Sequence, residues 1–187
     1  MFQQIGNLLI ESVFGFFIFL LLLRFYMQAF RAPFRNPAGE LVNTLTNWLV
    51  RPLRRFIPGL YGLDLSSLVL AWALDVVMLY LLSLLSGALP SASFIPRLLL
   101  IAVVDVARSS VHLLIGIVII QAILSWVASH NQISAVLDAL TRPFYNFFRR
   151  FIPPIGNIDL SPIFILLSAQ VVVIVLNQLT RVVATAF

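Results

Sequence analysis

The residues with the most suggestive chemistry are two adjacent arginines followed by a carboxylate. The motif Arg-Arg-Phe-Ile-Pro, then five residues, then Asp-Leu-Ser begins at Arg54 and begins again 95 positions later at Arg149. Paired guanidinium groups can bind an anion, and a carboxylate can act in acid–base catalysis or cap a helix. In each copy the aspartate, Asp64 or Asp159, stands just before an apolar stretch. The repetition indicates an internal duplication, and we predict that both aspartates are helix N-caps.

The composition requires a lipid environment around these residues. The chain is 61% hydrophobic and 10% charged, with a mean hydropathy of +1.04, whereas soluble domains are roughly 45–50% apolar and about 25% charged. All twelve basic residues are arginine, and most cluster beside apolar stretches, which favours anionic lipid headgroups over nucleic acid as the partner. The absence of cysteine excludes disulfides and thiolate metal sites.

Four apolar stretches are long enough to cross a bilayer, which takes about 20 residues. They cover residues 8–30, 65–85, 98–128 and 160–179. The third would reach about 46 Å at about 1.5 Å per residue, against a hydrocarbon core of about 30 Å. It therefore either tilts and projects, or residues 98–107 form a separate short helix. No cleavage site follows the first stretch, so we expect that helix to be retained.

Two shorter stretches, residues 38–57 and 133–151, carry apolar residues at helical spacing and polar residues on the other face. This pattern is typical of helices that lie on the membrane surface. We predict that their arginines bind anionic lipid or a protein partner: Arg51, Arg54, Arg55, Arg142, Arg149 and Arg150. Arginines at a membrane boundary can also serve only to set topology, and this alternative stays open.

These elements predict an all-α integral membrane protein built from two tandem repeats, residues 1–90 and 96–187. Each repeat would contain a transmembrane helix, a surface helix and a second transmembrane helix. Because two spans per repeat is an even number, both repeats should have the same orientation. The arginines lie within each repeat, so the positive-inside rule places both surface helices in the cytoplasm and both termini outside the cell inner (plasma) membrane.

One carboxylate lies deep in a predicted span. Asp75 is eleven residues past Asp64, or about 16 Å into the bilayer, where a charge is costly. Its counterpart in the second repeat, Gln170, is also polar, and Gln121 lies on the third span. We predict a polar seam of Asp75, Gln170 and Gln121 at mid-membrane. A hydrogen-bonded contact that joins helices or subunits and an ion or proton path are both compatible with it.

The duplicated motif resembles the YggT (YlmG) family of integral membrane proteins. The resemblance rests on Arg54-Arg55-Phe-Ile-Pro…Asp64-Leu-Ser, on its second copy ending in Asp159-Leu-Ser-Pro162, and on the run Gln121-Ala-Ile-Leu-Ser-Trp126. It implies two tandem YggT repeats and links to ion tolerance, cell division and envelope organisation, and cytochrome assembly in plastids. It supplies no catalytic or ligand residues.

The leading functional prediction is a scaffold or assembly protein of the inner membrane that binds anionic lipid and either a protein partner or further copies of itself. Envelope or cell-division organisation is the process in which it would act. The alternative is an ion or small-solute pathway through Asp75 in an oligomer, and a third idea, resting on the resemblance alone, is assembly of a membrane cofactor protein. No nucleophile motif or phosphate-binding loop occurs, and His112 and His130 lie far apart. We therefore expect no enzyme activity, no cofactor, no metal site and no nucleic-acid partner.

Overall fold

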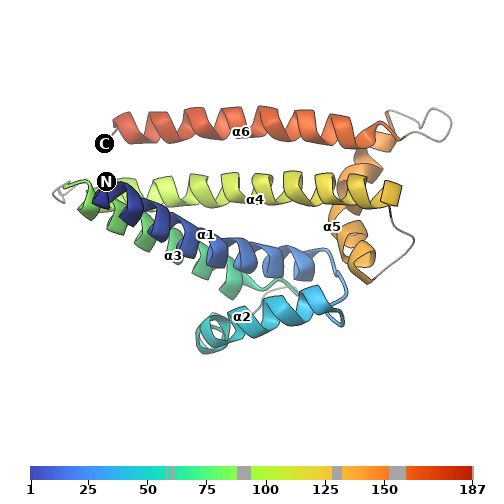
Figure 1. The fold of residues 1–187 in the computed structure, drawn as a ribbon, viewed down its shortest axis with the longest axis horizontal. Helices are drawn as coiled ribbons and strands as arrows, with labels where there is room; N and C mark the ends of the chain where they lie inside the picture. The colour runs from blue at the N-terminus through green and yellow to red at the C-terminus, as the bar shows by residue number, and fades with distance from the viewer. Residues whose placement is uncertain (58, 60–61, 88–93, 128–131, 152–158, 187) are drawn as a thin grey trace.

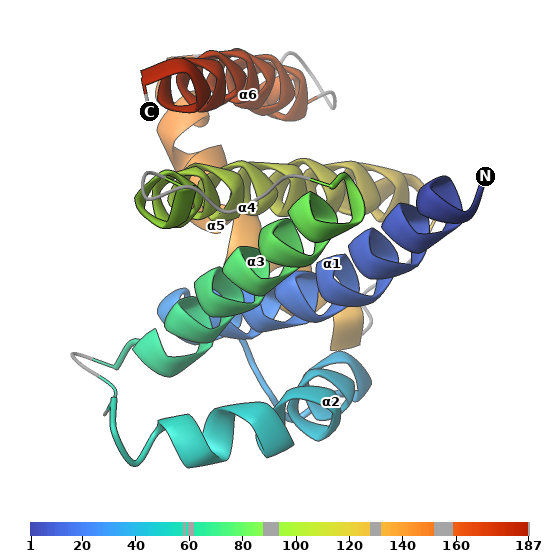
Figure 2. The ribbon, with the colours of Figure 1, turned by 90° about the vertical axis from the view of Figure 1, so that its left-hand side faces the viewer.

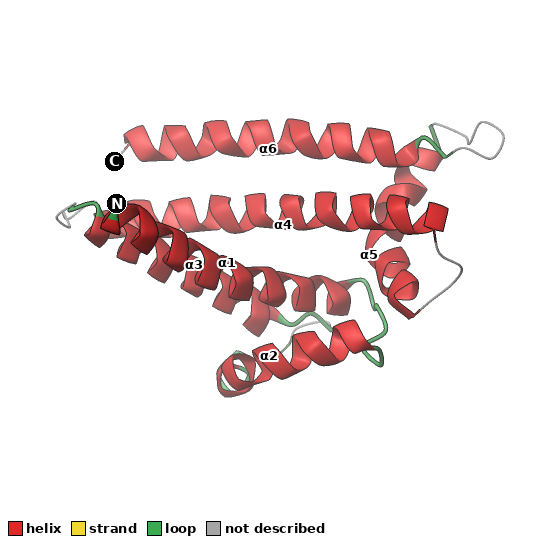
Figure 3. Ribbon diagram, viewed as in Figure 1, coloured by secondary structure: helices red, strands yellow, loops and turns green. Residues whose placement is uncertain are grey.

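The computed structural model describes residues 1–57, 59, 62–87, 94–127, 132–151 and 159–186. Every regular element in these ranges is a helix (Figure 3). The elements are α1 Phe2–Ala29, α2 Pro37–Leu53, α3 Leu65–Leu85, α4 Phe94–Val127, α5 Gln132–Arg149 and α6 Ser161–Ala186. Of these six, α1, α3, α4 and α6 are long and apolar enough to cross a membrane. The expected all-helical chain with four candidate spans is therefore confirmed.

The helix boundaries differ from the predicted spans mainly at the outer ends. α3 begins and ends where predicted, but α1 starts at Phe2, α4 at Phe94, and α6 continues to Ala186. α4 is a single helix of 34 residues, so residues 98–107 are part of it and not a separate helix. Hydropathy marks only the part of a helix that suits lipid, whereas the backbone hydrogen bonds continue until a residue breaks them.

The start of α2 shows how local sequence sets an element. Asn36 has an extended backbone, and its side-chain oxygen accepts a hydrogen bond of 2.9 Å from the N–H of Gly39. Pro37 occupies the first helical position, where its missing N–H costs nothing. A Cβ atom on Gly39 would lie 2.4 Å from the carbonyl oxygen of Phe34. The chain therefore turns sharply into α2 at a position that accepts only glycine.

The helices form layers, with α4 between α6 and the α1–α3 pair (Figures 1 and 2). α1 packs along α3, and α4 packs along α6, so each repeat contributes one pair of long helices. The N- and C-termini lie at the same end of the bundle (Figure 1). α5 lies across the opposite end of α4 and α6, and α2 lies beside α1 and α3 (Figure 1).

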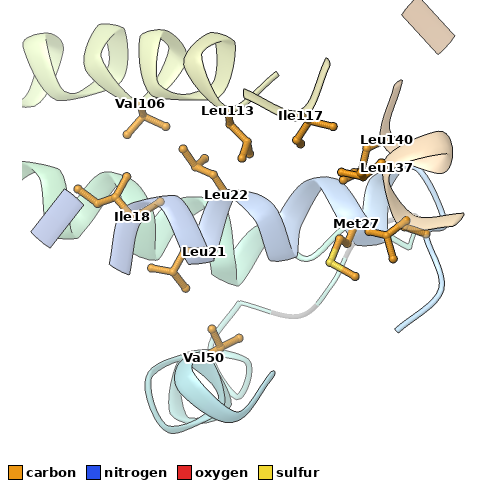
Figure 4. Close-up of a cluster of buried hydrophobic side chains, with 13 residues drawn as sticks. Ile18, Leu21, Leu22, Met27, Val50, Val106, Leu113, Ile117, Leu137 and Leu140 are labelled. Atoms are coloured by element: carbon orange, nitrogen blue, oxygen red, sulfur yellow. The ribbon is translucent and has the colours of Figure 1, made fainter. Parts of the chain in front are cut away.

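The main buried cluster is centred on α1 (Figure 4). Ile18 and Leu22 of α1 lie beside α4, whereas Leu21 faces Val50 of α2 (Figure 4). Met27, near the end of α1, belongs to the same cluster as residues of α5. A smaller cluster joins α4, α5 and α6. α1 is thus the element on which both short amphipathic helices and the second repeat are positioned.

Candidate functional site

The first copy of the motif forms a buried ion-paired junction between three helices. Arg24, near the end of α1, is only 4% exposed. Its Nε donates to Asp64 Oδ2 at 3.1 Å, and its Nη1 donates to Thr46 Oγ1 at 2.7 Å and to Asn47 Oδ1 at 2.9 Å. Arg54 reaches the same carboxylate, with Nη2 at 2.6 Å from Oδ2. We call these five residues the repeat-1 junction.

The predicted capping role of Asp64 is wrong. Asp64 occupies the N-cap position of α3, but its side chain makes no capping hydrogen bond to the helix backbone. Its Oδ2 instead accepts from Arg24, from Arg54 and from the hydroxyl of Ser67 at 2.8 Å. Burial alone would raise the pKa of Asp64, but the hydrogen bonds from Arg54 and Ser67 and the charges of Arg54 and Arg24 lower it overall. The carboxylate stays ionised because two guanidinium groups neutralise it.

The second copy repeats one half of this arrangement. Arg149 donates to Asp159 Oδ2 from Nη2 at 2.6 Å and from Nε at 3.0 Å. Oδ1 of Asp159 accepts from the N–H of Ser161, the first residue of α6, at 2.9 Å, which is the kind of bond predicted for this residue. Burial would raise the pKa of Asp159, but the bonds from Ser161 and Arg149 lower it overall. With 28% of its side chain exposed, Asp159 is much more accessible than Asp64.

The ion pairs change the interpretation of the six arginines. Arg54 and Arg149 were predicted to bind lipid or a partner, but both are held by aspartates of their own chain. Each pair joins the end of a short amphipathic helix to the start of the following long helix. The other four predicted residues are exposed and form no ion pair with any described residue: Arg51, Arg55, Arg142 and Arg150.

The predicted polar seam does not form. Asp75 is buried on α3, whereas Gln170 is exposed on α6. Gln121 lies at the end of α4 next to α5, where it accepts from the hydroxyl of Thr141 and donates to Asp138. The offset between repeats gives Asp75 and Gln170 similar depths. It does not give their helices a common interface, because α4 lies between α6 and the α1–α3 pair (Figure 2).

Asp75 instead lines a cavity of about 440 Å³ between α1, α3 and α4. The side chain is 2% exposed, and its Oδ2 has no hydrogen-bond partner among the described residues. Other polar residues of this cavity are Glu11, Ser109 and His112. The cavity therefore combines two carboxylates, an imidazole and a hydroxyl from three helices, a set of groups that can bind and release a proton.

Sequence reasoning missed several of these residues. Arg24 directly follows a continuous apolar run, a position typical of an arginine at the boundary of a span, and only the structure shows that it is buried. Glu11 and His112 lie far from Asp75 in sequence, and no spacing rule brings them together. Among the described residues, no group of three or more histidines and carboxylates is arranged to hold a metal ion. His130 lies outside the described residues.

The comparisons with known proteins agree with the duplicated architecture. A family model described as CCB3/YggT matches residues 3–85 and, separately, residues 100–180. The chain belongs to the CCB3/YggT family. It is 35% identical over 174 residues to an uncharacterised protein of Pseudomonas aeruginosa, with 91% of this chain and 88% of the relative covered. It is 30% identical over 165 residues to the uncharacterised protein YggT of Escherichia coli, with 88% and 85% covered.

A plant relative matches a shorter part of the chain. YlmG homolog protein 2, chloroplastic, of Arabidopsis thaliana is 43% identical over 56 residues, which is 28% of this chain and 22% of the relative. No solved structure matches the chain significantly. The YggT resemblance and the two tandem repeats are thus confirmed.

Proposed function

We propose that this CCB3/YggT-family protein is a small scaffold of the inner membrane, with α2 and α5 on its cytoplasmic surface. In this proposal the arginines of α2 and α5 bind anionic lipid headgroups and hold a partner protein complex near the membrane. The long helices serve as anchors, and the ion-paired junctions fix the angle at which α2 and α5 leave the bundle. No chemical step is assigned to the protein.

The observation that carries this proposal is a set of four exposed arginines, on α2 and α5 or within two residues of their ends, that form no ion pair with any described residue. They are Arg51, Arg55, Arg142 and Arg150. In each repeat one arginine of the pair is bonded to an aspartate of the chain, and the neighbouring arginine forms no ion pair with a described residue. A basic residue close to an anionic membrane surface contributes about 1 kcal/mol of attraction, so four of them provide substantial binding.

Charge reversal of these four arginines tests the proposal. The variant Arg51→Glu, Arg55→Glu, Arg142→Glu, Arg150→Glu should retain little anionic lipid after purification in detergent, whereas the unaltered protein should retain it in a salt-dependent manner. A matched control variant replaces the same residues by glutamine. It should retain an amount of anionic lipid between that of the charge-reversed variant and that of the unaltered protein. Equal retention by all three proteins, or retention that is independent of salt, would contradict the proposal.

A second candidate function is an ion or proton pathway, which the cavity at Asp75 favours. A carboxylate oxygen that is buried without a partner in a membrane-spanning helix is costly, and such groups often mark transport paths. Purified protein in liposomes should then show proton or monovalent cation flux that Asp75→Asn abolishes. Gln170→Asn is the control, because this residue has a similar depth but lies on the exposed face of α6. Equal flux in the unaltered protein and Asp75→Asn would remove this candidate.

A further inference from the structure

The two repeats differ in the residue that bonds to the equivalent threonine of the short helix, and this difference decides whether a pocket is filled or open. In repeat 1 the guanidinium group of Arg24 lies against the row of polar side chains on α2, which we call its polar stripe, and donates hydrogen bonds to Thr46 and Asn47. In repeat 2 the residue that bonds to the equivalent threonine, Thr141 of α5, is Gln121. Glutamine is shorter than arginine and carries no charge. Arg24 and Gln121 therefore occupy corresponding places, but only Arg24 extends to the following aspartate.

Beyond Gln121 the polar stripe of α5 is open. The structure has a pocket of about 250 Å³ here, which we call the repeat-2 pocket. Its lining includes Asp138, Arg142, Tyr145 and Asn146 in addition to Gln121. The corresponding stripe of α2 is covered by the side chain of Arg24. The duplication thus provides an internal comparison. In repeat 1 the polar side chains of the short helix are covered by Arg24, whereas in repeat 2 they line a pocket that has room for a ligand.

The pocket contains donor side chains that can bind an anion and a carboxylate that can bind a cation. Arg142 is exposed, and Arg149, which also lines the pocket, shares its guanidinium group with Asp159. Asn146 adds an amide and Tyr145 a hydroxyl group, and burial together with the charge of Asp159 raises the pKa of Tyr145, so that it remains a donor at neutral pH. Asp138, at the other end of the stripe, is exposed and accepts only from the neutral amide of Gln121 among the described residues.

The position of the pocket restricts the ligand. α5 lies across the end of α4, a candidate membrane span, so a pocket between Gln121 of α4 and α5 lies at headgroup depth if α4 crosses the bilayer (Figure 1). A purely anionic group would be repelled by Asp138, and a purely cationic group by Arg142. A group with a phosphate and an ammonium a few ångströms apart would match both. The ammonium must carry N–H donors to bond to the Asp138 carboxylate.

We propose that the repeat-2 pocket binds the headgroup of a phospholipid that carries both a phosphodiester and a primary ammonium group. The phosphate is bound by Arg142, Tyr145 and Asn146, and the ammonium by Asp138. Repeat 1 has no such site because Arg24 fills it. This inference rests on the proposed lipid-binding function and makes it specific to one repeat and one headgroup class.

The test is native mass spectrometry of the full chain titrated separately with phosphatidylethanolamine, phosphatidylcholine, phosphatidylglycerol and inorganic phosphate. Binding in the repeat-2 pocket, measured as the part of the affinity that the variant Gln121→Arg removes, should be tightest for phosphatidylethanolamine, since phosphatidylcholine lacks N–H donors, phosphatidylglycerol lacks the ammonium, and inorganic phosphate lacks both ammonium and acyl chains. The variant Gln121→Arg reproduces repeat 1 and should weaken phosphatidylethanolamine binding about tenfold, the effect of losing one charge-assisted contact. The control Thr44→Arg adds the same charge to an exposed position of α2 and should leave this affinity unchanged.

A second variant keeps the test decisive if Gln121→Arg fails to fold. Asp138→Asn should remove the preference for phosphatidylethanolamine over phosphatidylcholine while phosphate-dependent binding remains. The proposal is overturned if Gln121→Arg binds phosphatidylethanolamine as tightly as the unaltered protein, or if Gln121→Arg weakens the binding of phosphatidylglycerol or inorganic phosphate as much as that of phosphatidylethanolamine. If salt-dependent retention of anionic lipid is nevertheless lost on reversal of the four exposed arginines, the scaffold proposal survives and only the headgroup assignment fails.

Discussion

At the scale of single residues, the two aspartates of the motif have the same neighbours in sequence but different surroundings. The side chain of Asp64 is 1% exposed and is shared by two arginines, whereas that of Asp159 is 28% exposed and is bonded to one. Breaking a buried ion pair from one side costs about 3–5 kcal/mol, because the remaining charge stays buried without a partner. An exposed pair contributes about 0–1 kcal/mol.

The first prediction follows from this difference. Asp64→Asn should lower the stability of the detergent-solubilised protein by about 3 kcal/mol, since it leaves Arg24 buried without a counter-charge. Asp159→Asn is the matched control and should cost about 1 kcal/mol or less. Thermal unfolding followed by circular dichroism measures both. Equal destabilisation by the two substitutions would show that the repeat-1 junction is not more buried than its counterpart.

The second prediction concerns pH. Because the folded pKa of Asp64 is lower than that of an unfolded aspartate, about 3.9, the ionised carboxylate stabilises the fold above that value. This contribution should be lost as the pH falls from about 4 through the folded pKa. Melting temperatures measured from pH 7 down to pH 3 should therefore decrease more for the unaltered protein than for Asp64→Asn. Parallel curves for the two proteins would contradict the lowered pKa.

At the scale of elements, the entry into α2 depends on a close approach of backbone to Gly39. A Cβ atom there would lie 2.4 Å from the carbonyl oxygen of Phe34, and a backbone atom cannot move away without distorting the turn. Asn36 caps the same turn of the helix from a buried position. The orientation of α2, and with it the position of its arginines, depends on these few residues.

The third prediction tests that dependence. Gly39→Ala should destabilise the protein by roughly 1–3 kcal/mol, the range for an overpacked buried site. Gly116→Ala is the control, because an added Cβ in the middle of α4 meets nothing within 4 Å and alanine is the better helix former. Unfolding midpoints of the two variants provide the comparison. A neutral Gly39→Ala together with a destabilising Gly116→Ala would contradict this account of the turn.

The sequence predicted elements much better than contacts. Hydropathy and helical spacing located all six helices, because lipid and the membrane surface each demand a pattern that is visible along the chain. The role of Arg24 was not visible, since a basic residue at the end of an apolar run fits a simple boundary position equally well. Gln170 and Asp75 were expected together because depth follows from counting residues, whereas the lateral position of a helix depends on packing that no repeat offset encodes.

At the scale of the whole molecule, both short helices are connected to the ends of the long helices that lie away from the termini, with α5 across that end and α2 beside α1 and α3 (Figure 1). If the four long helices cross the bilayer, α2 and α5 are on one side and both termini are on the other. In the scaffold proposal that first side is the cytoplasmic one, as the positive-inside rule predicts from the arginines on and next to α2 and α5. The scaffold proposal requires this arrangement, because lipid and partner binding by both helices needs a common surface.

Cysteine accessibility measures this topology most directly, since the chain has no cysteine of its own. Single cysteines replace Gln3 near the start of α1, Glu40 on α2, Ala135 on α5 and Thr185 near the end of α6, all of which are exposed. In cells whose outer envelope is permeable to the reagent but whose inner membrane is intact, a membrane-impermeant maleimide should label positions 3 and 185 only. Positions 40 and 135 should be labelled only after the inner membrane is permeabilised. Labelling of position 40 or position 135 while the inner membrane is intact would contradict this topology.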